Sequence, residues 1–142
     1  MGSTPTRLRQ IDFGLAILDF GLIGVNEAEF KRRTKDIALR VIKVVQSLPK
    51  NFVAETIGKQ LLRSGTSIGA NYRAACRAKS TADIINKLTI VEEEADESMF
   101  WIELLIESEI VSPNKLKVLY SDIDEVVAMV VSSIKTIRAK KR

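Results

Sequence analysis

Residues 112–137, SPNKLKVLYSDIDEVVAMVVSSIKTI, carry the clearest structural pattern in the chain. Apolar or small side chains recur there at alternating intervals of three and four residues, from Leu116 to Ile137. That spacing places them along one stripe of an α-helix. Ser112 and Pro113 come just before the stripe, and a serine N-cap followed by proline at the first helical position is a strong helix start. The segment therefore predicts a long amphipathic helix that packs against other helices.

Three further helical segments lie upstream, separated by short breaks. The first is expected over about residues 27–47, ahead of Pro49, because proline disfavours helical geometry in the residue before it. The second is expected over about residues 52–77 with Asn51 as N-cap, and the third from the N-cap Ser80 to about residue 109. Short connections make successive helices antiparallel. We therefore predict an all-α fold, an antiparallel up-down four-helix bundle, over residues 27–142.

The apolar stripes of these segments define the expected core. They comprise Phe30, Thr34, Ile37, Val41, Val44 and Leu48 in the first segment, Ile57, Leu61, Ile68, Tyr72 and Ala75 in the second, Leu88, Ala95, Met99, Ile102 and Ile106 in the third, and Leu116, Leu119, Ile123, Val126, Val130, Ser133 and Ile137 in the fourth. Inside the second helix, Gly65 and Gly69 cost about 2 kcal/mol of helix propensity relative to alanine. Glycines at this spacing indicate a close approach to a neighbouring helix.

Residues 1–26 have a different character. The sequence Asp-Phe-Gly-Leu occurs at 12–15 and again at 19–22, and a glycine in each copy argues against a stable helix. Asp12 and Asp19 also interrupt the apolar run, which is unlike a signal peptide or a membrane span. We expect a poorly ordered leader over residues 1–26 and a cytoplasmic protein with no membrane partner.

The chain has no histidine and one cysteine. It therefore lacks the commonest general base and zinc ligand, and it can form no internal disulfide. Cys76 is expected to be a packing residue, with a reactive thiol as the alternative because Arg73 and Arg77 are close in sequence. The third helix carries carboxylates at Glu92, Asp96, Glu103 and Glu107, without a matching set on another helix. We expect no metal, no cofactor and no catalytic residue.

Charge is segregated along the chain. Residues 81–111 carry nine acidic residues and one basic residue, whereas the rest of the predicted bundle is net basic. On the second helix, Lys59, Arg63, Arg73 and Arg77 share the face opposite the core, and Lys79 follows them. We call these five residues the basic stripe. They are either a solvated face or a surface for phosphates or an acidic partner.

The third helix is apolar on nearly all sides over residues 99–106. Phe100, Trp101 and Leu104 lie away from its inner stripe, and a helix that is apolar all round is buried on more than one side. These three side chains are therefore the expected contact surface of a homo-oligomer.

The sequence LRSGTSIGAN at residues 62–71 resembles the hallmark of the four-helix-bundle proteins encoded in 23S rRNA intervening sequences. ADIINKL at 82–88 and EEEADES at 92–98 are also similar, and the resemblance covers about residues 28–135. It implies an antiparallel four-helix bundle and a ring-shaped homopentamer. A related protein, the accessory protein of diversity-generating retroelements, implies a reverse transcriptase and nucleic acid as partners. Arg63 matches the hallmark itself, and the resemblance transfers no catalytic residue.

Two functions remain open from the sequence. The first is a non-catalytic, homo-oligomeric accessory protein that binds RNA or DNA through the basic stripe. Few aromatic residues are available to stack on bases, so contacts to the phosphate backbone are expected. The alternative is a protein-protein interaction scaffold without nucleic-acid binding, in which the basic stripe pairs with acidic helices.

Overall fold

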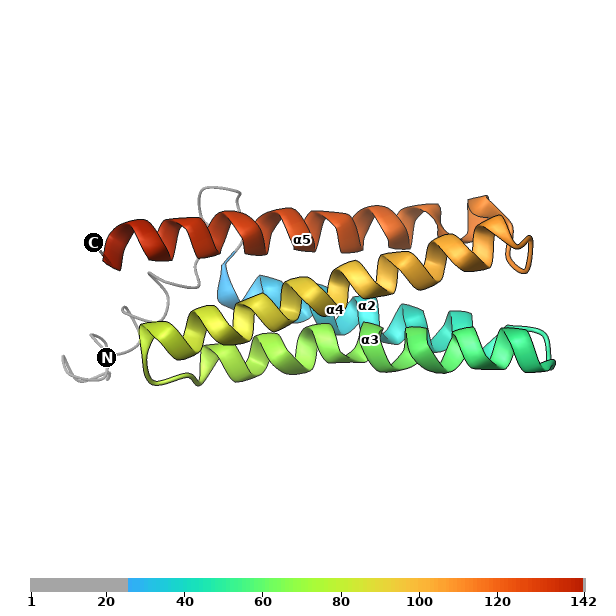
Figure 1. The fold of residues 1–142 in the computed structure, drawn as a ribbon, viewed down its shortest axis with the longest axis horizontal. Helices are drawn as coiled ribbons and strands as arrows, with labels where there is room; N and C mark the ends of the chain where they lie inside the picture. The colour runs from blue at the N-terminus through green and yellow to red at the C-terminus, as the bar shows by residue number, and fades with distance from the viewer. Residues whose placement is uncertain (1–25, 142) are drawn as a thin grey trace.

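The computed structural model describes residues 26–141, which form four long helices (Figure 1). They are α2 (Glu27–Gln46), α3 (Phe52–Cys76), α4 (Thr81–Glu107) and α5 (Pro113–Lys141). Each helix runs antiparallel to the previous one and packs against it, while α2 and α5 touch each other only sparsely. The predicted all-α, up-down four-helix bundle is confirmed. The expected leader lies outside the described residues except for Asn26, which belongs to the start of α2.

Side-chain caps set the beginnings of three helices. Asn26 accepts a hydrogen bond from the Glu29 backbone N–H at 2.9 Å, and Asn51 accepts one from Ala54 at 2.9 Å. Ser80 accepts one from Asp83 at 3.0 Å. These bonds satisfy backbone donors that the first turn leaves without a partner. The predicted caps Asn51 and Ser80 are therefore confirmed, and Asn26 is an additional one.

The helix α4 ends two residues earlier than the sequence suggested. Glu109 has a positive φ of 64°, and the backbone N–H groups of Ile110 and Val111 both donate to the Leu105 carbonyl at 3.0 Å. A left-handed residue just beyond a helix commonly terminates it in this way, usually with glycine at that position. Because no glycine marks the site, the sequence alone placed the end of α4 too late.

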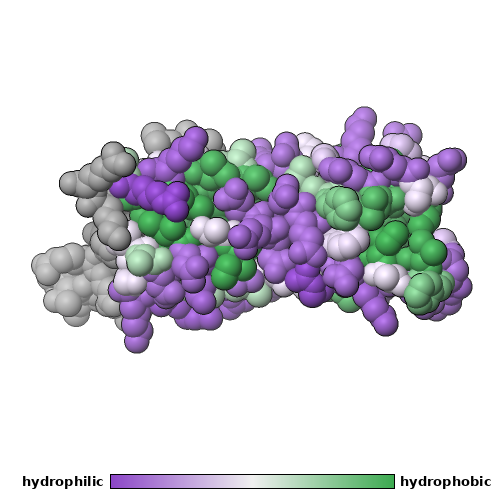
Figure 2. All heavy atoms as spheres, in the orientation of Figure 1, coloured by the Kyte–Doolittle hydropathy of each residue, from purple (hydrophilic) through white to green (hydrophobic). Residues whose placement is uncertain are grey.

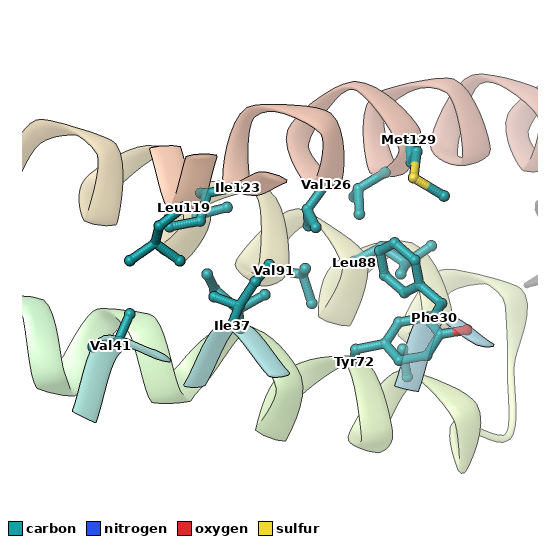
Figure 3. Close-up of a cluster of buried hydrophobic side chains, with 14 of the residues drawn as sticks. Phe30, Ile37, Val41, Tyr72, Leu88, Val91, Leu119, Ile123, Val126 and Met129 are labelled. Atoms are coloured by element: carbon teal, nitrogen blue, oxygen red, sulfur yellow. The ribbon is translucent and has the colours of Figure 1, made fainter. Parts of the chain in front are cut away.

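The core runs along the bundle axis and is made from all four helices (Figure 3). Every predicted core residue of α5, from Leu116 to Ile137, is buried. In α4 the predicted stripe was partly wrong, since Val91, Ser98 and Leu105 are buried whereas Met99 and Ile106 are only partly so. The reason is packing against α3: the Ser98 hydroxyl donates to Ser64 Oγ at 2.8 Å in the interior. An aromatic pair, Phe30 and Tyr72, closes the core between α2 and α3 with ring centroids 4.5 Å apart.

Three buried glycines bring α3 against α2. A Cβ atom added to Gly65 would lie 2.8 Å from Val41 Cγ2, and one added to Gly58 would lie 2.9 Å from Leu48 Cδ1. At Gly69 the nearest atom would be Thr34 Oγ1, 3.2 Å away. We call these three pairs the glycine contact. It confirms the close approach predicted from Gly65 and Gly69 and adds Gly58 to it.

The substitution Gly65→Ala tests the glycine contact. Alanine would favour the helix by about 1 kcal/mol, yet its methyl group would overlap Val41, and overpacking costs about 1–3 kcal/mol. We expect a net loss in the free energy of unfolding, measured by urea denaturation. The loss should shrink when Gly65→Ala is made in a Val41→Ala background, because that change removes the overlapping methyl groups. A Gly65→Ala protein that is more stable than the wild type would contradict the close contact.

Candidate functional site

The basic stripe is exposed along α3 and the turn that follows it, but its members have different surroundings. Lys59, Arg73, Arg77 and Lys79 are exposed and form no ion pair within the described residues. Arg63 instead leans toward α4, where its guanidinium pairs with Glu94 at 3.2 Å and also with Glu97. Within one chain, Arg63 therefore already has acidic partners, while the rest of the basic stripe does not.

Glu97 of α4 accepts hydrogen bonds from one side chain of α3 and one of its own helix. The Trp101 indole N–H donates to Glu97 Oε2 at 3.0 Å, and Arg63 donates to the same oxygen. These hydrogen bonds, that of Trp101 first, lower the pKa of the Glu97 carboxyl. The indole N–H of the partly buried Trp101 is therefore already used by a carboxylate of its own helix.

A groove between α2 and α3 gathers further cations. Its volume is about 610 Å³, and Lys31, Arg32 and Lys35 from α2 line it together with Arg73 from α3. Small residues, among them Ala38, Gly69 and Ala70, form its apolar part, and no carboxylate lines it. We call it the α2–α3 groove. The three α2 cations were missed by the sequence analysis, because a helical wheel of α3 alone cannot show what the neighbouring helix places beside it.

Where α2 faces α5, cations and carboxylates line the same hollow. A hollow of about 330 Å³ at the α2–α5 junction is lined by three arginines and by Glu29, Asp36, Asp122 and Glu125. Arg33 pairs with Glu125 at 2.5 Å and Arg40 with Asp122 at 2.7 Å, which joins α2 to α5. Arg33 and Arg40 at this junction are thus paired with carboxylates of another helix, whereas Lys35 and Arg73 of the α2–α3 groove form no ion pair in the described residues.

The predicted oligomer surface on α4 is partly exposed. Phe100 is 49% exposed, whereas Trp101 and Leu104 are half-buried. The rings of Phe100 and Trp101 meet edge to face with centroids 5.0 Å apart. Other apolar residues are more exposed, notably Phe52 at 83% at the start of α3, and Figure 2 shows hydrophobic surface at that end of the bundle. The sequence analysis did not single out Phe52.

Cys76 packs partly buried against the core. Burial raises the pKa of its thiol to about 11, and the nearby Glu27 carboxylate acts in the same direction. The proximity of Arg77 lowers the pKa much less than burial raises it. The structure therefore favours the packing role over the reactive thiol.

Among residues 26–141 there is no group of three or more side chains arranged to hold a metal ion. No helix in this range is both long and apolar enough to cross a membrane.

Comparison with known proteins decides the family. Residues 26–132 match the family described as 23S rRNA-intervening sequence protein. The chain belongs to this family. A crystal structure from Bacteroides thetaiotaomicron, described as a protein of unknown function from the S23 ribosomal protein family, has a TM-score of 0.71 and 38% sequence identity. That match covers 77% of this chain and 97% of the other. No curated protein matches the chain.

The part matched to the 23S rRNA-intervening sequence family contains the α2–α3 groove, the glycine contact and the Glu97 contact in full. It stops at residue 132, within α5. The last turns of α5, including Lys135 and Arg138, lie beyond the match.

The environment of Cys76 predicts a slow reaction with thiol reagents. With a pKa of about 11, its thiolate fraction at pH 8 should be about 100-fold below that of a cysteine with pKa 9. Alkylation by iodoacetamide, followed by mass spectrometry, should be slow at pH 8 and should accelerate as the pH rises toward 11. The urea-unfolded protein supplies the control. Equal rates for folded and unfolded protein would show that Cys76 is accessible and not protected by burial.

Proposed function

We propose that this member of the 23S rRNA-intervening sequence family is a non-catalytic, homo-oligomeric accessory protein that binds nucleic acid through the basic face of α2 and α3. The observation that carries the proposal is the set of exposed cations without ion-pair partners in the described chain, Lys59, Arg73, Arg77 and Lys79. Cations in this state attract phosphates and release counterions when they bind them.

The composition of this face indicates the mode of binding. No aromatic side chain lines the α2–α3 groove, so it offers no platform on which a base can stack. Lysine and arginine contacts to phosphate oxygens carry little sequence information. We therefore infer binding to the RNA or DNA backbone, with weak sequence preference and strong dependence on salt.

Self-association is the second part of the proposal. Phe100 is an exposed aromatic residue on α4, which carries more acidic residues than any of the other three helices. In a ring, such an acidic and apolar surface on one copy would meet a basic surface on the next, because a heterologous contact joins two different patches. Complementary charge favours that orientation of the two copies.

The alternative function, a protein-protein interaction scaffold, is favoured by one observation. Arg63 pairs with Glu94 and Glu97 of its own chain, as that alternative expects for the basic stripe. If the same pairing extends between subunits to the rest of the basic stripe and to the cations of the α2–α3 groove, no cationic surface is left there for nucleic acid. Whether these cations are ion-paired or exposed in the oligomer therefore distinguishes the two functions.

Charge reversal tests nucleic-acid binding. Arg73→Glu combined with Arg77→Glu should weaken binding of fluorescent single-stranded RNA or duplex DNA about tenfold or more at low salt, because phosphate contacts are lost. Fluorescence anisotropy across a salt series measures the affinity. Lys115→Glu with Lys117→Glu, an equal charge change on α5, is the matched control and should have a much smaller effect. A wild-type protein that binds neither ligand at low salt would leave the scaffold as the better function.

A substitution on α4 tests self-association. Phe100→Asp adds a charge to the exposed aromatic surface and should lower the mass measured by light scattering toward that of one chain. Val118→Asp, on the similarly exposed part of α5, serves as control and should keep the mass of the wild type. Circular dichroism should show the same helix content in all three proteins. An unchanged mass for Phe100→Asp would remove this surface from the interface.

A further inference from the structure

The α2–α3 groove differs from two other charged hollows in the described chain by its lack of acidic residues. The hollow at the α2–α5 junction has similar cations, but four carboxylates line it as well. At the opposite end of the α2–α3 surface, the hollow around Lys50 and Lys59 includes Glu55. Only the α2–α3 groove, among these three, presents cations from two helices to the same space with no anion among them.

Local ion pairs account for two of its four cations. Lys31 pairs with Glu27 at 3.2 Å, and Arg32 with Glu29 at 2.6 Å, each one turn back along α2. Lys35 and Arg73 have no such partner in the described residues. They line the groove from opposite helices, so two positive charges face it without compensation.

The groove exists because of the glycine contact. Gly69 has no side chain and lies against Thr34, while Ala38 and Ala70 add only methyl groups at its rim. Larger side chains at these positions would fill the space between the cations. The hydroxyl groups of Thr34 and Thr66 donate to backbone carbonyls of their own helices, Phe30 at 3.0 Å and Leu62 at 2.7 Å. The donors left for a ligand are therefore the ammonium and guanidinium groups.

We propose that the α2–α3 groove is a discrete phosphate-binding site centred on Lys35 and Arg73. Two uncompensated positive charges match one doubly charged phosphate, or two successive phosphodiesters, better than a single carboxylate. The fork of an arginine also fits phosphate oxygens in a bidentate manner. A volume of about 610 Å³ accepts a group larger than one phosphate.

This inference rests on the proposed function where it takes the phosphates to be those of RNA or DNA. The same chemistry is offered by free phosphate compounds, so the experiment uses both sources. Inorganic pyrophosphate, titrated into the full chain at low salt by calorimetry, measures the site by itself. Single-stranded RNA, followed by fluorescence anisotropy, measures its part in nucleic-acid binding.

Lys35→Glu combined with Arg73→Glu should weaken pyrophosphate binding at least tenfold. For RNA, it should also lower the slope of log affinity against log salt by about one to two, since each phosphate contact contributes about 0.7–0.9 to that slope. Lys43→Glu with Lys50→Glu makes an equal change of charge at two exposed lysines that do not line the α2–α3 groove. It should leave pyrophosphate binding within about twofold of the wild type if the site is local, as the short screening length in salt predicts. Circular dichroism checks that both variants fold.

Each outcome separates the two proposals. If RNA binds and both double variants weaken it equally, the basic face is diffuse and the groove is not a site. If pyrophosphate binds in the groove but no nucleic acid binds, the site stands and the proposed function falls. If the wild type binds neither pyrophosphate nor RNA at low salt, both proposals are overturned.

Discussion

The contact between α2 and α3 at Gly58, Gly65 and Gly69 is the constraint on which the rest of the surface depends. Val41 and Leu48 occupy the space where side chains on α3 would otherwise stand. The close approach fixes which residues of the two helices lie side by side, and it leaves a hollow where small residues meet. Glycine at these positions lowers the intrinsic stability of the helix relative to alanine. Packing between helices therefore outweighs local preference in this part of the bundle.

The packing of α3 against its neighbours also determines which of its arginines form ion pairs. Arg63 and Arg73 lie on one broad face of α3, but they lean to opposite sides of it. Arg63 pairs with carboxylates of the acidic helix α4. Arg73 instead lines the α2–α3 groove together with cations of α2 and forms no ion pair in the described residues. A charge pattern on one helix thus becomes an ion pair at one position and a proposed anion-binding surface at another. Exposed pairs such as that of Arg63 contribute little to stability, so their effect is mainly on what remains available to a partner.

Both sides of α2 carry lysines or arginines, but the two sides differ in how far carboxylates neutralise these cations. Toward α5, arginines and carboxylates neutralise each other and connect helices that otherwise touch only sparsely. Toward α3, four cations line the groove with no carboxylate in its lining, and two of them, Lys35 and Arg73, form no ion pair in the described residues. Repulsion among such cations is tolerated on a solvated surface and is relieved by an anion. This contrast between the two sides of α2 distinguishes a candidate binding surface from ordinary surface charge.

The sequence by itself determined the fold, since the three-and-four spacing from Leu116 to Ile137, the caps Asn51 and Ser80 and the breaks at Pro49 and Pro113 are all local signals. It also located the close contact at Gly65 and Gly69, because glycine inside a helix has few other uses. It could not choose the buried side of α4, where apolar residues surround the helix, nor foresee the end at Glu109. Only the tertiary structure placed Lys31, Arg32 and Lys35 beside Arg73 and paired Arg63 with Glu97. These juxtapositions depend on the register and rotation of one helix against another, which packing fixes and no single-helix pattern contains.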